Sequence, residues 1–558
     1  MSRMLSLLLL TIIVVLGAFL RFYKLAEIPS GFYVDEAAIG YNAYSVIKTG
    51  ADEYGKTWPI FLRSYNAYSS PMYMYLTTFA VSAYGLSIWS TRFLSALVGS
   101  MSIVVVYLIL KNIDVIKSRL SVIATVTIFT ISPWSIFFSR GAFEANLAFL
   151  FLCVSVLAIF KSKERKWLFV LAVAILSIST YAYQAQRLIA VFLTGYSVFW
   201  VFRPKSIRGL FNKFTITSAI VFVFIQIPQI LIMTKPAFGS RAGGLFYKDD
   251  VLTQSDKIPL PYFVSYLLSF IREFGAKFVS YLSPRSLFHL PDPDTQRSIP
   301  ELSAFYSWVV IPFLVGIYQL LKLLKREYVQ FVVALTIITI LPAALTTDPF
   351  STLRSLGLLL PVTIIITMGI DKLISYKPKI TCLTLLLLIV ISLIQLWRSY
   401  FVLFPTLYAK SWDYGYRELV QEIETRPDTK ILIDENRNNP SYIKLAFFMQ
   451  LDPEILQQSV DMPIAEDYYG GQEFVSDYQF QNIEVRNLVW DKDIYDEQLI
   501  IGDTLAISDD QAKEHELTKV FQIFDPSEKV VFAGFVTNPH AKCQKISFQN
   551  KLCDPYLN

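Results

Sequence analysis

The first 44 residues hold the two features that decide the fold, an apolar run of membrane length and a pair of carboxylates beyond it. Residues 4–20 read MLSLLLLTIIVVLGAFL, and residues 31–44 read GFYVDEAAIGYNAY, with Asp35 directly before Glu36. The apolar run is long enough to cross about 30 Å of hydrocarbon. It has the basic residue and apolar core of a signal peptide but no clear small-residue cleavage site, so we expect a retained first span.

Further apolar runs of this kind follow up to residue 397. They lie at roughly 91–110, 120–138, 142–160, 167–183, 187–202, 214–233, 303–321, 329–345, 356–370 and 380–397. Every second short connector is rich in Lys and Arg, namely 111–119, 161–166, 203–213, 322–326 and 372–379. Because basic short loops stay cytoplasmic, the sequence predicts a polytopic α-helical membrane protein with about eleven transmembrane helices. Its N-terminus is predicted to be cytoplasmic, and residues 21–90 and 234–302 form long outer loops.

Two further apolar stretches, 71–88 and 258–276, are left out of this count because they would break the charge alternation. We expect both to be interfacial or re-entrant helices on the outer face, where tyrosines are common. The alternative is that they are ordinary spans with misassigned neighbours.

The charge balance separates the chain into two regions. Of the 558 residues, 54% are apolar and only 17% are charged, whereas a soluble chain carries charge on about a quarter of its residues. Residues 1–400 hold 36 Lys and Arg against 18 Asp and Glu, and residues 401–558 hold 14 against 27, so the balances of +18 and −13 sum to +5. The acidic tail would repel phosphate backbones, and we therefore expect no nucleic-acid partner.

The tail from residue 398 onward has the pattern of a small soluble domain. Residues 430–434 and 529–535 are strand-like, and residues 441–450 are helical in pattern. We therefore predict a membrane domain at 1–397 and a small extracytoplasmic α/β domain at 398–558. Cys543 and Cys553 could close a loop in an oxidising compartment, and the sequence leaves that pairing open.

Two sites near the ends of predicted spans carry carboxylates. Asp35 and Glu36 follow the first span, although a helix N-terminus alone would explain two acidic residues there. Arg140 and Glu144 lie at the outer mouth of two spans, where ionisable groups are costly and often functional. The alternative for the second pair is a simple i,i+4 ion pair.

Several arginines fall on the predicted outer face, where the positive-inside rule disfavours cations. Their guanidinium groups suit a phosphate because the planar fork binds two oxygens at once. For each one alone, a lipid headgroup or a local salt bridge explains it equally well. The predicted phosphate-binding residues are Arg140, Arg187, Arg285, Arg297 and Arg354.

Together these features resemble the polytopic GT-C glycosyltransferases of family 39, the protein O-mannosyltransferases and aminoarabinose lipid A transferases. The resemblance rests on the order and spacing of Asp35-Glu36, Pro71–Tyr75 with Gly85 and Arg92–Leu97, Arg140–Glu144, Tyr281–Phe288 and Leu353–Pro361. It implies an inverting hexosyl- or pentosyltransferase of the cell envelope. Such an enzyme takes a sugar from a polyprenyl-phosphate carrier and passes it to a protein, lipid or glycan acceptor on the outer face of the plasma membrane, among membrane lipids.

The resemblance also implies roles for single residues, with departures that leave the substrate undecided. It makes Asp35 the catalytic carboxylate, next to Glu36, and Glu144 a second acidic position that is often Asp in the family. Related aminoarabinose transferases have an acidic–basic pair where this chain has Ser69-Ser70, and an arginine where it has Ala38-Ile39. The phosphate must then be held by other arginines.

A carboxylate base and arginines are sufficient for this chemistry. The base draws the proton from an acceptor hydroxyl, and the phosphate leaves as an anion that arginines stabilise, so no metal is required. The three histidines are scattered and we predict no metal ligands, with a divalent cation kept open as a cofactor. A transporter or flippase of lipid-linked sugars would need charges at mid-membrane and internal repeats. A non-catalytic subunit with the same fold is the other alternative.

Overall fold

The chain forms two compact units. The computed structural model describes residues 3–65, 67–204, 206–243, 247–348, 350–436, 440–459, 467–470, 477–545 and 551–557. The helical unit comprises Met1–Leu25, Tyr68–Tyr73 and Arg92–Leu403, and the mixed unit comprises Ala26–Ala67, Met74–Thr91 and Phe404–Asn558. Most of the first predicted outer loop therefore belongs to one unit with the C-terminal tail. The domain division predicted from the sequence, 1–397 and 398–558, stays a prediction.

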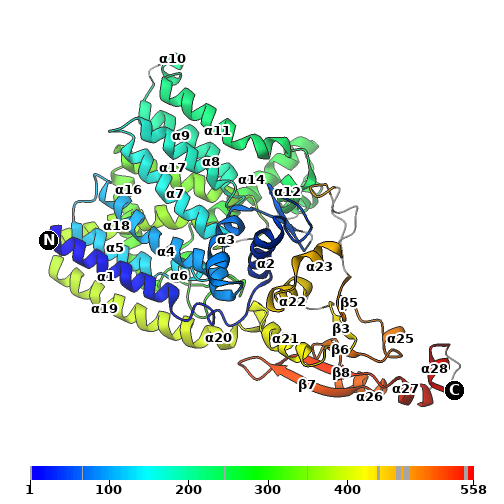
Figure 1. Cartoon of the computed structure of the whole chain (residues 1–558). Helices are drawn as coiled ribbons and strands as arrows, with labels where there is room; N and C mark the ends of the chain where they lie inside the picture. The colour runs from blue at the N-terminus through cyan, green and yellow to red at the C-terminus, as the bar shows by residue number, and fades with distance from the viewer. Residues whose placement is uncertain are drawn as a thin grey trace. The chain divides into compact units, whose positions relative to one another are not determined.

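The helical unit is a bundle of long apolar helices, drawn from blue through cyan to yellow-green in Figure 1. At its centre, α18 packs against α16, α5 and α17. The long helices are α1 (Arg3–Phe22), α4 (Ile88–Lys111), α5 (Arg119–Ile131), α7 (Glu144–Lys161), α8 (Trp167–Ser179), α9 (Gln186–Phe202), α11 (Lys213–Leu231), α14 (Tyr262–Ser280), α16 (Val310–Lys322), α17 (Glu327–Ala344), α18 (Leu359–Tyr376) and α19 (Pro378–Leu396).

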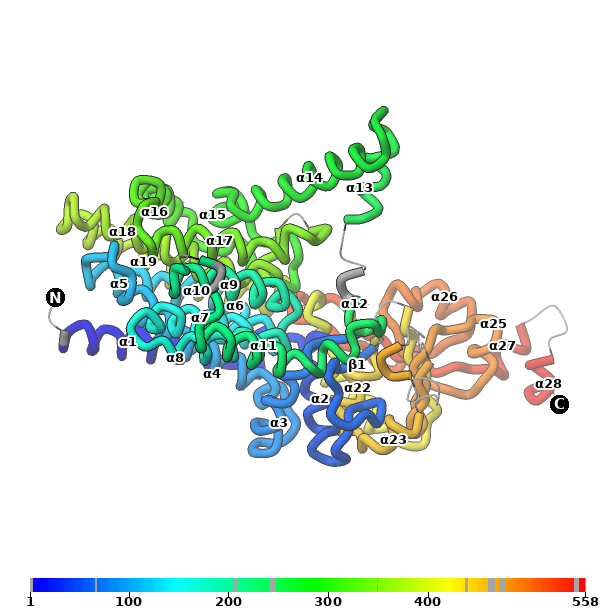
Figure 2. The backbone as a smooth tube through the Cα atoms, turned by 90° about the horizontal axis from the view of Figure 1, so that it is seen from above, coloured from blue at the N-terminus to red at the C-terminus, as the bar shows by residue number. Residues whose placement is uncertain are grey.

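Shorter elements connect these helices. They are α6 (Pro133–Phe138), α10 (Ile207–Leu210), α12 (Pro236–Gly243), α13 (Lys248–Ser255), α15 (Pro284–Phe288), the 3₁₀ turns Ser307–Val309 and Leu356–Leu358, and a π-helical segment Trp397–Leu403. Figure 2 shows α13 and α14 side by side, and the two helices contact each other.

Seven helices among the described residues are long and apolar enough to cross a membrane. They are Met4–Phe22, Ile88–Lys111, Glu144–Lys161, Lys213–Leu231, Glu327–Ala344, Leu356–Tyr376 and Pro378–Leu407. Four shorter apolar helices, Arg119–Ile131, Trp167–Ser179, Gln186–Phe202 and Ser307–Lys322, coincide with the other predicted runs. The chain is a multi-pass integral membrane protein, while the count of eleven spans and the orientation of the termini stay predictions.

The predicted run 120–138 is two helices rather than one. Ser132 ends α5 and also caps α6, where its hydroxyl accepts a hydrogen bond from the Ser135 N–H at 3.2 Å. The break follows from Pro133, which lacks an N–H and disfavours helical backbone in the residue before it. A proline at the first position of a new helix is well tolerated.

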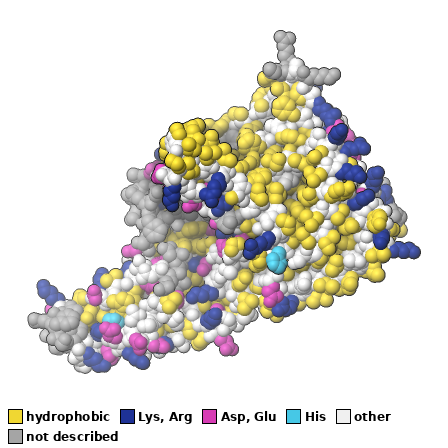
Figure 3. Space-filling view, turned by 180° about the vertical axis from the view of Figure 1, so that it is seen from behind, with side chains coloured by type: hydrophobic (Ala, Val, Ile, Leu, Met, Phe, Trp, Pro, Cys, Tyr) yellow, Lys and Arg dark blue, Asp and Glu magenta, His cyan; other side chains and the backbone are white. Residues whose placement is uncertain are grey.

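Burial along the helices distinguishes the centre of the bundle from its surface. In the central span that contains α18, 78% of the residues in its 18-residue apolar window are buried. In the spans that contain α11 and α19, only 11% and 17% of the window residues are buried. Large apolar side chains such as Phe224 on α11 and Leu383 on α19 are exposed. Figure 3 shows hydrophobic side chains gathered over the surface of this unit. Apolar surface of this extent marks contact with lipid.

The two stretches left out of the span count are helical. Residues 71–88 contain α3 (Met72–Tyr84), and residues 258–276 fall within α14. Neither helix is among the seven candidate spans. Their interfacial placement stays a prediction.

The mixed unit contains one six-stranded sheet with helices, drawn in yellow to red for its C-terminal part in Figure 1. Its helices are α2 (Val34–Thr49), α3, α20 (Phe404–Leu407), α21 (Tyr416–Glu424), α22 (Tyr442–Phe448), α23 (Pro453–Gln458), α25 (Trp490–Asp493), α26 (Asp509–Glu514), α27 (Pro539–Lys545) and α28 (Asp554–Leu557), with 3₁₀ turns at Lys410–Trp412 and Lys551–Cys553. The strands of this sheet are β3 (Ile431–Asp434), β4 (Tyr478–Phe480), β5 (Ile483–Arg486), β6 (Leu499–Gly502), β7 (Thr518–Phe524) and β8 (Val530–Val536). Two further strands, β1 (Leu62–Ser64) and β2 (Ala67–Ser69), pair in a separate two-stranded sheet.

The sheet has strand order β4-β5-β3-β6-β8-β7. The central strand β3 is parallel to β5 and β6, with Ile431 opposite both Ile483 and Leu499. β3 is buried over its whole length, as expected for a strand covered on both faces. The predicted α/β tail, its two strands and its helix at 441–450 are confirmed, and Cys543 and Cys553 form a disulfide with their Cα atoms 5.5 Å apart.

Candidate active site

The first turn of α2 separates the two adjacent carboxylates. Glu36 is buried, and its Oε2 atom accepts a hydrogen bond from the Tyr33 N–H at 3.4 Å, one half of a capping box. Asp35 is half-buried. Consecutive residues of a helix point about 100° apart. Glu36 therefore stabilises the start of the helix, and Asp35 is the more exposed member of the pair.

Asp35 is held by a tyrosine from the same predicted outer loop. The Tyr65 hydroxyl donates a hydrogen bond to Asp35 Oδ1. Tyr65 has a backbone φ of 38°, in the left-handed region that residues other than Gly, Asn and Asp seldom adopt. Its backbone N–H donates to the Tyr442 Oη atom at 3.0 Å. Tyr442 lies on α22 in the C-terminal tail, so the tail helps to fix the residue that contacts Asp35.

Behind Tyr442 lies a buried carboxyl group. The Tyr442 hydroxyl donates to Glu53 Oε2 at 3.1 Å, and Asn42 Nδ2 donates to Glu53 Oε1 at 3.2 Å. The Glu53 N–H in turn donates to Asn42 Oδ1 at 2.8 Å. Burial raises the pKa of Glu53 to about 8, and the nearby Asp52 carboxylate adds to this effect. Asn42 follows Asp35 by seven residues, about two helical turns, so the same face of α2 carries both residues.

A second set of contacts joins the tail to the same loop. The Tyr468 hydroxyl donates to Asp52 Oδ2 at 2.5 Å and accepts a hydrogen bond from the Arg63 N–H at 2.7 Å. Gln457 Nε2 donates to the Asp52 carbonyl at 2.8 Å. Gly40 lies where α2 and α22 pack closely, since a Cβ atom there would lie 2.6 Å from the Phe447 ring. The tail thus holds both α2 and the loop that follows it.

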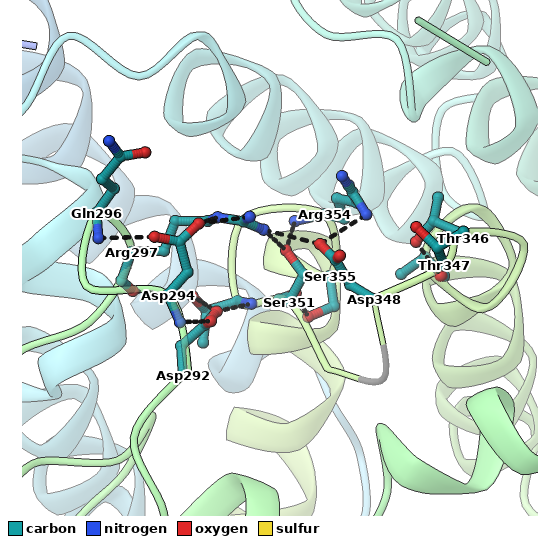
Figure 4. A network of polar contacts seen from close by, with 12 residues as sticks. Asp292, Asp294, Gln296, Arg297, Thr346, Thr347, Asp348, Ser351, Arg354 and Ser355 are labelled. Atoms are coloured by element: carbon teal, nitrogen blue, oxygen red, sulfur yellow. Dashed lines mark hydrogen bonds and ion pairs between the residues drawn. The ribbon is translucent and has the colours of Figure 1, made fainter. Parts of the chain in front are cut away.

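The helical unit contains a separate cluster of charged residues, seen from close by in Figure 4. Asp348 Oδ2 lies 3.1 Å from Arg297 Nη1 and 2.7 Å from Arg354 Nη1. Arg297 also contacts Asp294 Oδ2 through Nε at 2.7 Å and Nη2 at 2.6 Å, and its Nη1 donates to Ser351 Oγ at 2.6 Å. Two of the five arginines predicted to bind phosphate therefore share one carboxylate oxygen. Neighbouring carboxylates raise the pKa of Arg297 against the effect of burial, so it stays charged.

The loop that carries Arg354 is anchored from several sides. Asp292 Oδ2 accepts hydrogen bonds from the Thr352 N–H at 2.8 Å and from its hydroxyl at 2.7 Å. Trp134 Nε1 donates to the Thr352 carbonyl at 2.9 Å. The buried Tyr281 ring packs against the Phe350 ring, with their centroids 5.4 Å apart. Tyr281, from the Tyr281–Phe288 motif, thus packs beside the loop that leads into the Leu353–Pro361 motif.

Lys277 on α14 brings a third cation to this loop. Its Nζ atom donates a hydrogen bond to the carbonyl of Thr347. We call Lys277, Arg297 and Arg354 with Asp292, Asp294 and Asp348 the charged cluster. It holds three cationic and three carboxylate side chains.

Arg140, predicted to bind phosphate, contacts the backbone at the end of α1. Its Nη1 donates to the carbonyls of Leu20 and Arg21 at 2.6 and 3.1 Å, and its Nη2 donates to that of Tyr23 at 2.7 Å. Helix C-terminal carbonyls lack partners within the helix, and a basic side chain can satisfy them. These contacts favour a structural role for Arg140. Glu144 is the first residue of α7, so Arg140 precedes that helix and the i,i+4 spacing of a continuous helix does not apply.

The other two arginines predicted to bind phosphate are Arg187 and Arg285. Their described surroundings differ from those of the charged cluster. Arg187 Nη1 donates to the Phe238 carbonyl at 2.9 Å, with the guanidinium 4.4 Å above the Phe238 ring. Arg285 is the second residue of α15 and is exposed. Within the described ranges, no group of three or more His, Cys, Asp or Glu side chains is arranged to hold a metal ion.

Sequence reasoning missed Tyr65, Tyr442 and Asp348. The chain has 32 tyrosines, and nothing in the local pattern distinguishes the two that connect Asp35 to the tail. Asp348 carried a weak signal, because it lies six residues before Arg354 in a short loop between two apolar runs.

No protein-family model matches the sequence, and no curated protein matches it. Among solved structures, ArnT from Cupriavidus metallidurans bound to undecaprenyl phosphate is similar, with a TM-score of 0.53 and 11% identity over 96% of this chain and 98% of that chain. The archaeal oligosaccharyltransferase AglB from Archaeoglobus fulgidus, in complex with an inhibitory peptide and a dolichol-phosphate, has a TM-score of 0.45 and 13% identity over 79% of this chain and 63% of that chain. The similarity to ArnT shows the fold, and the chain has the GT-C fold that the sequence predicted.

Proposed function

We propose that this protein is an inverting glycosyltransferase that moves a sugar from a polyprenyl-phosphate carrier to an acceptor hydroxyl. The observation that carries the proposal is the fold similarity, which covers nearly the whole of both chains and joins this protein to one solved with undecaprenyl phosphate bound. The helical unit offers the cations of the charged cluster as candidates for binding a phosphate, and the mixed unit offers Asp35 with Tyr65 as a candidate base.

In the proposed reaction, Asp35 is the general base. The acceptor oxygen attacks the anomeric carbon as its proton passes to the Asp35 carboxylate, and the bond from that carbon to the phosphate oxygen breaks. The electron pair leaves on the phosphate, and a single displacement inverts the anomeric centre. The Tyr65 hydroxyl, which donates to Asp35 Oδ1, holds the carboxylate in one orientation. Glu144 stays the second acidic candidate.

The arginines of the charged cluster would stabilise the departing phosphate. Arg297 and Arg354 are only 19% and 16% exposed, and charge-assisted hydrogen bonds are strongest where water is largely excluded. Residues that stabilise charge developed in the transition state accelerate the chemical step itself. Arg187 and Arg285 are weaker candidates for binding the same phosphate.

We further propose that the reaction takes place on the outer face. The alternating basic connectors support this placement, and so does the disulfide between Cys543 and Cys553, since disulfides persist in oxidising compartments. The donor sugar is a hexose or pentose, and the acceptor is a hydroxyl of a protein, lipid or glycan.

The test is a transfer assay with the purified full chain in nanodiscs. It uses a panel of polyprenyl-phosphate-linked radiolabelled sugars with membrane extract as the source of acceptors. We expect label in an acceptor fraction and release of the lipid phosphate, both lost in Asp35→Asn. Movement of the lipid-linked sugar between leaflets without release of phosphate would instead identify a flippase. Absence of transfer across the whole panel would favour a non-catalytic subunit.

A further inference from the structure

We propose that the Asp348 carboxylate competes with the carrier phosphate for Arg297 and Arg354. This competition weakens binding of the product lipid phosphate and so speeds its release. The inference rests on the proposed function, because it concerns the same arginines. Asp348 Oδ2 contacts both Arg297 and Arg354, and a phosphate held by these two residues would need the same guanidinium nitrogens.

The contacts of Asp348 differ from those of a carboxylate that serves only to build a loop. One oxygen meets both arginines, and in neither pair do two guanidinium nitrogens reach two carboxylate oxygens, the arrangement that makes such pairs strong. Arg354 Nη1 is buried and lies 2.7 Å from Asp348, yet it makes no hydrogen bond of good geometry to any described residue. A buried donor in this condition calls for an explanation, and a phosphate oxygen would supply the missing acceptor.

The neighbouring carboxylates behave differently. Asp294 receives two nitrogens of Arg297 as well as the N–H of Gln296 at 2.8 Å. Asp292 receives the N–H and the hydroxyl of Thr352. Both therefore fix backbone in place, as Figure 4 shows. Asp348 is 33% exposed, and in the described parts of the chain its side chain forms ion pairs with the two arginines. It can turn away without breaking a backbone hydrogen bond.

The charge of the ligand decides which step Asp348 affects. The three carboxylates of the charged cluster balance its three cations, so an incoming phosphate meets a site that is neutral before it arrives. The sugar donor is a phosphodiester with one negative charge. The product is a phosphomonoester, which carries close to two charges at pH 7 because its second pKa is about 6. Repulsion by Asp348 therefore opposes the product more than the donor.

The experiment measures binding of undecaprenyl phosphate to the full chain in nanodiscs, together with inhibition of transfer by that lipid. For Asp348→Asn, which keeps the shape and removes the charge, we expect roughly tenfold tighter binding, a smaller gain for the sugar donor and stronger product inhibition. Asp294→Asn is the matched control, since losing a carboxylate that positions Arg297 should weaken binding of both lipids. Melting temperature and gel filtration verify that each variant is folded.

Two outcomes would overturn the inference in distinguishable ways. If Arg354→Ala weakens lipid-phosphate binding but Asp348→Asn leaves it unchanged or also weakens it, Asp348 is a positioning residue and the phosphate site stands. If Arg354→Ala and Asp348→Asn both bind the lipid as the parent does, the phosphate site of the proposed function lies elsewhere and the inference falls with it.

Discussion

The Tyr65 hydroxyl donates a hydrogen bond to Asp35 Oδ1, while the neighbouring Glu36 accepts from the Tyr33 N–H to cap the same helix. The two carboxylates should therefore respond differently to loss of charge. We expect Asp35→Asn to lower transfer by about 10²-fold or more, because an amide cannot accept the acceptor's proton. Glu36→Gln should be milder, since the amide oxygen can still cap the helix. Initial rates at saturating donor test this, with protein yield and donor binding as controls.

The result for Glu144 decides whether this assignment holds. If Asp35→Asn keeps full transfer while Glu144→Gln abolishes it, the base lies at the start of α7. If neither substitution matters, the enzymatic function loses its main support.

Tyr65→Phe removes the hydrogen bond to Asp35 and keeps the ring. We expect kcat to fall about tenfold, in line with one charge-assisted hydrogen bond, while KM for the donor changes little. A hydrogen bond to a carboxylate favours its charged form, so the acid limb of the kcat/KM profile should move to higher pH in the variant. An unchanged profile with a reduced rate would assign Tyr65 to packing alone.

Tyr442→Phe tests whether the tail positions Asp35 through Tyr65. The variant leaves the Tyr65 N–H without the Tyr442 oxygen that accepts from it at 3.0 Å. We expect a fall in kcat of about three- to tenfold, with donor binding intact. Combining it with Tyr65→Phe should add little, because both substitutions act on the same contact. Fully additive losses would show that Tyr442 acts by another route.

The hydrophobic pattern predicts the long apolar helices and the strands β3 and β8, whereas the GT-C fold is predicted by the resemblance to family 39. Long apolar runs are stable when they are buried or face lipid. Their lengths therefore predict which segments span the membrane, and the charges between them predict the orientation. Pro133 indicates the helix break at Ser132, although the apolar run continues across it.

The contacts of the candidate site could not be predicted in the same way. Tyr442 follows Tyr65 by 377 residues and meets it through a backbone N–H, a relation that leaves no mark on the local sequence. Arg140 is a case in which the contacts favour a second role beside the predicted one. A cation at the predicted outer mouth of two spans suggested an anion, whereas its guanidinium contacts the carbonyl groups at the end of α1.

Arg354→Ala should weaken binding of the sugar donor about ten- to a hundredfold, because one charge-assisted contact contributes roughly 1.5–3 kcal/mol. Arg354→Lys should restore only part of this, since lysine lacks the planar fork. Arg140→Ala is the contrast: we expect a lower melting temperature from the loss of its contacts to the end of α1. Equilibrium binding in nanodiscs measures the first effect and thermal unfolding the second. Parent-like donor affinity in Arg354→Ala would move the phosphate site to Arg187 or Arg285.

The buried Glu53 predicts how the stability of the mixed unit depends on pH. Burial raises its pKa to about 8 from an ordinary value of 4.5. Between these values the folded chain keeps a proton that the unfolded chain has lost, so the free energy of unfolding falls as pH rises, by about 1.4 kcal/mol per pH unit. The contribution is complete below pH 4.5 and is lost as the pH passes 8. Asp52, with its pKa raised to about 6 by burial, acts in the same direction at lower pH.

Glu53→Gln resembles the protonated form at every pH. Its amide can accept from Asn42 and donate to the Tyr442 oxygen, whose own hydroxyl can turn to the Tyr54 oxygen 3.5 Å away. We therefore expect the melting temperature of the variant to equal or fall below that of the parent at pH 6 and to exceed it at pH 9. Thermal unfolding of both proteins at the two pH values gives the comparison. Equal pH dependence in parent and variant would mean that Glu53 is ionised in the folded protein, with Asn42 and Tyr442 as donors to its carboxylate.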